Sequence, residues 1–193
     1  MYRLLASCLL VVSAHAAAAQ QIPRVRIGII GHPGPVSVDS LATEVTIAAP
    51  RGVTFRALAQ VLAGLKVPVD TRDSTRGIIG EMSVPRMRTF GTGRISKYLN
   101  CGSGVTGLNA DNWRVYVTAL AFVEAADSAT TTLRLAMSGG AQAVAGSSTD
   151  PRKHCSPTWT SARTRRWIAK SSDRAADHTS LRAFLWHLFR ARV

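Results

Sequence analysis

The sequence lacks any apolar run long enough to cross a membrane. A membrane-spanning helix needs roughly 20 consecutive apolar residues, whereas the apolar run at residues 4–12 is far shorter. That run follows the single cation Arg3 and leads into a series of small residues, an order typical of a secretory signal peptide. We therefore expect an exported protein (periplasmic, envelope-associated or secreted) with a signal peptide at residues 1–19 and cleavage before Gln20. Cleavage before Ala17 is the second choice.

A competing signal overlaps this leader. Leu5-Ala6-Ser7-Cys8 matches the lipobox of bacterial lipoproteins, which would lipidate Cys8. In such leaders the apolar region precedes the cysteine, whereas here most of it follows. The sequence therefore favours a cleaved signal peptide, with lipidation of Cys8 as the alternative.

Acidic residues are scarce. The chain has 11 Asp and Glu against 24 Lys and Arg, a formal net charge of +13. Residues 151–193 hold ten basic and two acidic residues, compared with thirteen and nine in 20–150. A positive surface favours anionic partners. For an exported chain we expect an envelope protein or an anionic lipid surface rather than nucleic acid. The residues expected to contact an anionic surface are Arg163, Arg165, Arg166, Trp167, Arg182, Arg190 and Arg192.

Cysteines are few, and their number is informative. Of three, one leaves with the signal peptide, so Cys101 and Cys155 remain. An even number of cysteines in an exported chain predicts a disulfide, and a closed loop of this length stabilises the fold by roughly 4 kcal/mol. The alternative is that Cys155 acts as a nucleophile beside His154, but neighbouring residues of an extended chain point to opposite faces.

Periodicity predicts one long helix and several strands. Phe55, Leu58, Leu62 and Leu65 fall on one helical face, and Pro50 suits a first helical turn. Alternation and β-branched residues predict strands, the last two forming a hairpin. These strands are expected at residues 43–47, 77–84, 86–95, 113–124 and 130–137.

The order of elements predicts an α+β fold in one domain. We expect an antiparallel sheet with one long helix packed across it and a C-terminal amphipathic helix; helix-grip folds have a similar order of elements. Prolines and glycines at residues 31–35 indicate an N-terminal arm over 20–42. The main domain is then 43–170, and 171–193 form a linker and the basic amphipathic helix.

The C-terminal helix has an apolar face and a basic face. Its apolar residues follow helical spacing, and arginines and tryptophans accompany them. Two interpretations remain open: the apolar face packs on the sheet, or it lies on an anionic membrane, where tryptophan and arginine favour the interface. The apolar positions are Leu181, Phe184, Leu185, Leu188 and Phe189.

One segment carries a resemblance. Asn100-Cys101-Gly102 and a late Cys155-Ser156 enclose Asp111, Trp113 and a threonine-rich strand. Together with residues 61–68 and 77–80, this stretch resembles a group of small exported bacterial proteins of unknown function. The resemblance covers roughly 43–155; residues 157–166 depart from the group's pattern. It implies a shared fold and disulfide but no activity.

Catalytic and metal-binding patterns are absent from the sequence. The glycine-rich segment 102–107 lacks the Gly-Lys-Ser/Thr ending of a P-loop, so a flexible loop is favoured over a phosphate cradle. No Gly-x-Ser-x-Gly elbow occurs, and no histidine has the spacing of a metal ligand. We therefore expect no metal and no cofactor, and assign no catalytic residue. The favoured interpretation is a non-catalytic binding or assembly domain of the cell envelope, which binds a partner or a small apolar ligand. An exported hydrolase with a site assembled from scattered residues is the alternative.

Overall fold

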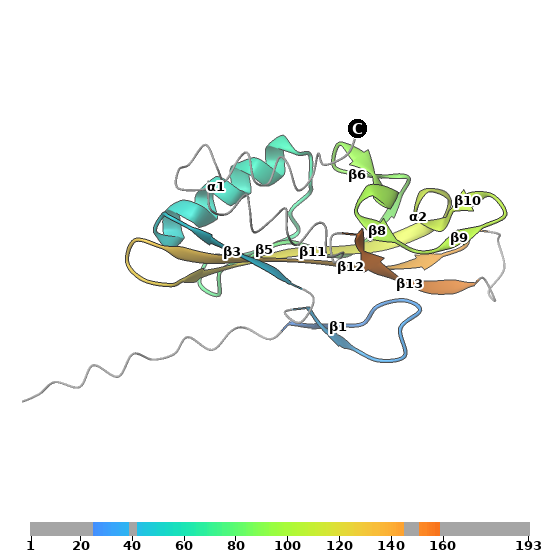
Figure 1. Cartoon of the computed structure of the whole chain (residues 1–193), viewed down its shortest axis with the longest axis horizontal. Helices are drawn as coiled ribbons and strands as arrows, with labels where there is room; N and C mark the ends of the chain where they lie inside the picture. Colours follow the sequence, from blue (N-terminus) through green and yellow to red (C-terminus); the bar gives the residue numbers. More distant parts are fainter. Residues whose placement is uncertain (1–24, 39–41, 145–150, 159–193) are drawn as a thin grey trace, which may run out of the picture.

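An antiparallel β-sheet forms the centre of the computed structural model, which describes residues 25–38, 42–144 and 151–158 (Figure 1). The strands are β1 (Arg26–Ile27), β2 (Val36–Ser37), β3 (Thr43–Ile47), β4 (Thr71–Asp73), β5 (Ile78–Met87), β6 (Thr89–Phe90), β7 (Gly93–Arg94), β8 (Leu99–Asn100), β9 (Ser103–Gly104), β10 (Gly107–Leu108), β11 (Arg114–Ala125), β12 (Thr131–Gln142) and β13 (Arg152–Pro157). The helices are α1 (Arg51–Gly64), α2 (Asn109–Asn112) and the 3-10 helix η2 (Ile95–Lys97).

The main sheet has seven strands in the order β4-β5-β11-β12-β13-β8, with β3 also paired to β12. The long hairpin β11–β12 is its centre, in register from Arg114 opposite Gln142 to Ala125 opposite Thr131. β3 and β13 pair with successive parts of the outer side of β12. Every neighbouring pair in this sheet is antiparallel.

Alternation along β11 gives the sheet two buried faces. Val115, Val117 and Val123 belong to the core that contains α1, whereas Leu120 and Phe122 belong to a second core on the opposite face. Successive side chains of a strand point to opposite faces, so the continuous apolar run at residues 119–123 of β11 is covered on both sides.

Helix α1 and the chain from β6 to α2 together cover the face of the sheet that carries Val115, Val117 and Val123. Helix α1 packs Phe55, Leu58 and Leu62 over one end. The chain from β6 to α2 covers the other end and contributes Phe90 and Leu99 to the same core. Figure 1 shows α1 above one end of the sheet, and β6, β8, β9, β10 and α2 above the other.

The N-terminal hairpin β1–β2 covers the second face. The sequence placed residues 20–42 in an arm outside the main domain. In the described part of that arm, Ile27, Ile29 and Val38 are buried and pack with Phe122. Figure 1 shows β1 on the side of the sheet opposite α1. The sheet is thus the middle of three layers.

The expected α+β class, with a long helix packed across the sheet, is wrong. The described part of the protein is mostly antiparallel β-sheet, with 50% strand and 18% helix, and α1 is its only helix of seven residues or more. The physical reason is that irregular, glycine-containing segments close the other half of the face as short hairpins. Gly91 has a φ of 57° and Arg88 a φ of 65°, so the segment after β5 turns back on itself.

Several predicted features lie outside the described residues. These are the signal peptide, the linker and the C-terminal amphipathic helix. Within the described residues, no helix has the length and apolar character that crossing a membrane requires.

Candidate functional site

An open pocket lies beside the first turns of helix α1. It has a volume of about 240 Å³ and is lined by Arg51, Gly52, Phe55, Arg56, Arg72 and Ser74, which we call the arginine pocket. Four of these residues come from α1, and Arg72 and Ser74 come from β4 and the turn after it. Three of the lining residues are arginines, and none is acidic.

Arg51 is fixed in place by backbone carbonyls. Its Nε donates to the Val123 carbonyl oxygen at 3.0 Å, and its Nη2 donates to the carbonyl oxygens of Ser74 and Thr75 at 2.8 and 2.9 Å. A Cβ on Gly77 would lie 2.9 Å from Nη2, so glycine makes room for this side chain. Because all three acceptors are neutral, they orient the guanidinium without cancelling its charge.

Phe55 and Arg72 form one wall of the pocket. The Arg72 guanidinium carbon lies 6.0 Å from the centroid of the Phe55 ring, at the outer limit of a cation–π contact. Phe55 itself is buried in the core and cannot shift easily. The Phe55 ring therefore helps to position the Arg72 guanidinium, which is otherwise exposed on the edge strand β4.

The charge of the pocket is not balanced by ion pairs. Among the described residues, Arg51, Arg56 and Arg72 have no salt bridge with a carboxylate. The nearest acidic residues along the chain, Asp73 and Asp70, accept hydrogen bonds from the backbone N–H groups of Arg76 at 2.8 Å and Met82 at 3.2 Å, and neither forms a salt bridge with these arginines. Three guanidinium groups around one small volume produce a positive local potential that attracts an anion.

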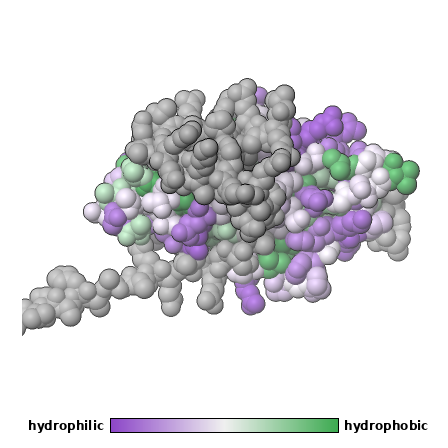
Figure 2. All heavy atoms as spheres, in the orientation of Figure 1, coloured by the Kyte–Doolittle hydropathy of each residue, from purple (hydrophilic) through white to green (hydrophobic). Residues whose placement is uncertain are grey.

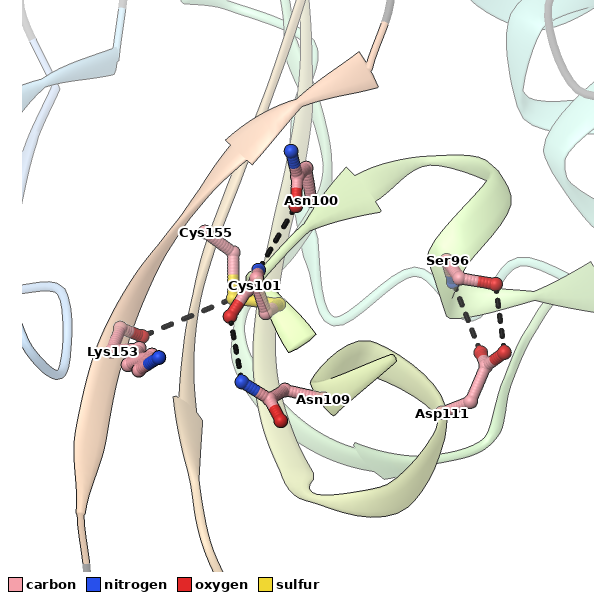
Figure 3. The surroundings of a disulfide bond; sticks show 8 residues. Ser96, Asn100, Cys101, Asn109, Asp111, Lys153 and Cys155 are labelled. Atoms are coloured by element: carbon pink, nitrogen blue, oxygen red, sulfur yellow. Dashed lines mark hydrogen bonds between the residues drawn. A yellow bond between two sulfur atoms is a disulfide. The ribbon is translucent and has the colours of Figure 1, made fainter. Parts of the chain in front are cut away.

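The disulfide forms a second local structure, at the other end of the sheet. Cys101 and Cys155 are joined, with their Cα atoms 4.2 Å apart, which fits the pairing that the cysteine count predicts. Figure 3 shows Asn109 beside this bond; its Nδ2 donates to the Cys101 carbonyl oxygen at 3.1 Å. Ser96 donates from Oγ to Asp111 at 2.8 Å in the same region. These contacts brace the loop, and the bond leaves neither of these two sulfurs as a thiol that could react.

His154 lies on the face of β13 opposite its neighbour Cys155. Its ring centroid is 5.2 Å from that of His32, which belongs to the turn of the N-terminal hairpin. Burial, and then the charge of His32, lower the pKa of His154. His154 is therefore neutral near pH 7 and belongs to the contact between hairpin and sheet rather than to a thiol site.

The glycine-rich segment is a braced hairpin rather than a phosphate cradle. Gly102 N–H donates to Asn100 Oδ1 at 2.9 Å, so it is already satisfied. Asn112 Nδ2 donates to the carbonyl oxygens of Thr106 and Leu108. These hydrogen bonds therefore join residues of the same loop to one another.

The described residues in the view of Figure 2 show no apolar binding groove. In the view of Figure 2, hydrophilic side chains cover much of the described end that carries β8 to β10, and the hydrophobic spots between them are small. The most exposed apolar residues there, Val105 and Leu108, belong to the β9–β10 hairpin. Neither the arginine pocket nor this hairpin provides the apolar cleft that a small hydrophobic ligand needs.

The predicted anionic-surface contacts lie outside the described residues. This applies to Arg163, Arg165, Arg166, Trp167, Arg182, Arg190 and Arg192. Of the predicted site residues, the structure brings together only Cys101 and Cys155 within its described part.

Sequence reasoning missed the arginine pocket, although a signal was present. No acidic residue occurs between Glu44 and Asp70, whereas this stretch contains Arg51, Arg56 and Lys66. The larger excess of positive charge at 151–193 indicated the C-terminal segment as the anion-binding region instead. The contribution of Arg72 depends on the pairing of β4 with β5, which the sequence did not predict.

Comparison with protein-family models, curated proteins and solved structures finds no match for this chain. The resemblance to a group of small exported proteins therefore stays a prediction.

Proposed function

We propose that this protein is an exported binding domain that holds an anionic group of its ligand in the arginine pocket. The observation that carries this proposal is the set of three guanidinium groups, Arg51, Arg56 and Arg72, around one open volume without a carboxylate partner among the described residues. Binding, rather than chemistry on the ligand, is the role that such a lining supports.

The pocket suits a phosphate, sulfate or carboxylate group. Guanidinium groups present planar pairs of N–H donors that match the oxygens of these anions. The volume of about 240 Å³ is below the range of roughly 300–1,000 Å³ that encloses a drug-sized molecule. A charged group of a larger ligand therefore fits better than a whole small molecule.

The leader and the cysteines support a location outside the cytoplasm. An apolar leader that ends in small residues is typical of export, and a disulfide persists in oxidising compartments. Anionic polymers and anionic lipids are abundant at cell envelopes, so an exported cationic pocket has candidate ligands close by.

The alternative of an exported hydrolase has less support. A two-carboxylate mechanism needs a pair of carboxyl groups on opposite sides of a substrate. The lining of the arginine pocket includes no acidic residue.

Titration calorimetry with inorganic phosphate tests the proposal. The Arg56→Gln and Arg72→Gln variants should each bind phosphate about tenfold more weakly, because a charge-assisted hydrogen bond contributes roughly 1.5–3 kcal/mol. Both side chains are exposed, so neither change should unfold the protein. Arg26→Gln removes the same charge from the hairpin on the opposite face and should leave binding unchanged. Equal weakening by all three variants would show only non-specific attraction and would contradict a pocket.

A further inference from the structure

A second cationic pocket lies beyond the other end of helix α1. It has a volume of about 320 Å³ and is lined by Lys66, Pro68, Pro85, Arg86, Met87, Thr89 and Gly91, which we call the lysine pocket. Lys66 follows the end of α1, and Arg86 and Met87 lie in β5. Like the arginine pocket, its lining includes cations and no carboxylate.

Arg86 is held at the wall of this pocket by a buried carboxylate. Its Nη2 lies 2.6 Å from Glu81 Oε2, and the Glu81 side chain is fully buried. The Arg86 side chain remains 26% exposed, so part of it faces solvent. Glu81 offsets some of the charge of Arg86, and it fixes the direction of this long side chain.

Backbone strain gathers around the same pocket. Three non-glycine residues in the described chain have a positive φ: Lys66 at 56°, Ser83 at 52° and Arg88 at 65°. Lys66 lines the pocket, and the other two lie within two residues of its lining, on β5 and just after it. Strain of this kind costs energy and is concentrated at functional sites in proteins.

The position of Lys66 is the clearest case. Lys66 N–H donates to the Ala63 carbonyl oxygen and Val67 N–H donates to that of Leu62, which is the hydrogen-bond pattern of a Schellman motif. The residue at this place is usually glycine because it needs a positive φ. Here the chain has a lysine, which lines the pocket.

The exposed face of α1 connects the two pockets. The helix runs from Arg51, in the arginine pocket, to Gly64, just before Lys66. At a rise of about 1.5 Å per residue, a helix of this length separates the pockets by about 20 Å. No acidic residue occurs in the helix, so nothing in it repels an anionic chain. The exposed residues of α1 between the two pockets have small, amide-bearing or cationic side chains; they are Gly52, Arg56, Gln60, Ala63 and Gly64.

We propose that the ligand is a linear anionic polysaccharide, whose charged groups occupy both pockets while the chain runs along the exposed face of α1. This inference rests on the proposed function, because it takes the arginine pocket as one of the two contact points. Single-stranded nucleic acid fits less well, since it needs exposed aromatic rings for stacking, and the one aromatic ring at these pockets, Phe55, is only 6% exposed. A membrane fits less well, since neither pocket carries a broad apolar surface.

The test compares probes of different length on the mature chain. Heparin-derived oligosaccharides serve as probes, from a disaccharide to chains longer than the helix that separates the pockets. Two contacts on one chain act as linked sites, so affinity should rise steeply once a chain spans both pockets. The Lys66→Gly variant should weaken the binding of long chains about tenfold, whereas the amide shifts that inorganic phosphate induces at the arginine pocket should be unchanged.

Lys66→Gly is a suitable variant because glycine favours the positive φ at this position. It should melt at or above the temperature of the natural protein, so a loss of binding cannot come from unfolding. Arg26→Gln, with the same change in charge, should bind long chains as the natural protein does.

The outcomes separate this inference from the proposed function. If Lys66→Gly and the natural protein bind long chains equally, the bridging ligand is wrong, while phosphate binding at the arginine pocket still stands. If phosphate binding is insensitive to Arg56→Gln and Arg72→Gln, the proposed function fails as well. Tighter binding of oligothymidylate, or of anionic vesicles at equal charge, would overturn the choice of a polysaccharide.

Discussion

Gly140 lies directly beneath Ile30, and the contact leaves no room for a side chain. A Cβ built on Gly140 would stand 2.3 Å from the Ile30 carbonyl oxygen and 2.6 Å from the Ile30 Cβ. Gly140 is in the middle layer, on β12, and Ile30 is in the turn of the N-terminal hairpin. This close approach holds the hairpin on the second face of the sheet.

The Gly140→Ala variant should lose the docking of the hairpin. Forcing a methyl group into a closely packed contact costs about 1–3 kcal/mol, so the melting temperature should fall by several degrees. Gly28→Ala, in the hairpin itself, is the matched control, because a Cβ there meets nothing within 4 Å. Thermal unfolding followed by circular dichroism measures both. If both alanine variants melt alike, the close approach is not what holds the hairpin.

The same glycine explains a strand that the sequence did not predict in full. Ser138-Gly139-Gly140 is typical of a break, so the sequence predicts a strand at residues 130–137 and a separate weak strand through Ala145, whereas β12 runs unbroken to Gln142. Gly139 and Gly140 weaken strand propensity locally, but they allow β8 and the N-terminal hairpin to approach the two faces closely. Such a tertiary contact is invisible in a local pattern.

The helix and the long hairpin could be predicted because their signals are local. Residues expected on the apolar face of the helix, Phe55, Leu58 and Leu62, are buried, and the alternation of the first hairpin strand agrees with β11. The short strands from β6 to β10 are too brief to show any periodicity. The arginine pocket joins the start of α1 to β4, two segments separated by the rest of the helix, so no short stretch of sequence contains it.

Removal of the disulfide should destabilise the fold. Cys101→Ser opens a loop whose ends are 54 residues apart in the sequence. For a loop of this length, the chain-entropy model gives a loss of stability of roughly 4 kcal/mol. The loop spans β9 to β12, so its loss affects the centre of the sheet. Denaturant unfolding of the variant, and of natural protein with and without a reducing agent, measures the effect. Unchanged stability after full reduction would contradict this account, and two free thiols in untreated protein would contradict the bond itself.

Glu81 should make stability depend on pH in a particular direction. Burial raises its pKa above the ordinary value of 4.5, although the hydrogen bond and charge of Arg86 oppose this shift. The folded state then holds the proton more tightly than the unfolded state. Glu81 therefore contributes stability that is fully present below its ordinary pKa and is lost as the pH rises through the raised pKa.

The Glu81→Gln variant cannot ionise at this position, so it provides the comparison. Its free energy of unfolding, relative to the natural protein, should improve as the pH rises from the acid range towards neutral. Groups such as His154 titrate in both proteins and cancel in the difference. A difference that stays constant with pH, or that changes in the opposite direction, would mean that the fold does not raise the pKa of Glu81.

The central claim is that the arginine pocket binds an anion, and an amide NMR titration of the mature protein with inorganic phosphate tests it most directly. Phosphate should shift the amide signals of Gly52, Phe55 and Ser74, which line the pocket, and these shifts should disappear in the Arg56→Gln, Arg72→Gln double variant. If the shifts occur only among residues 159–193, the anion contacts belong to the basic C-terminal segment, and the arginine pocket is not the binding site.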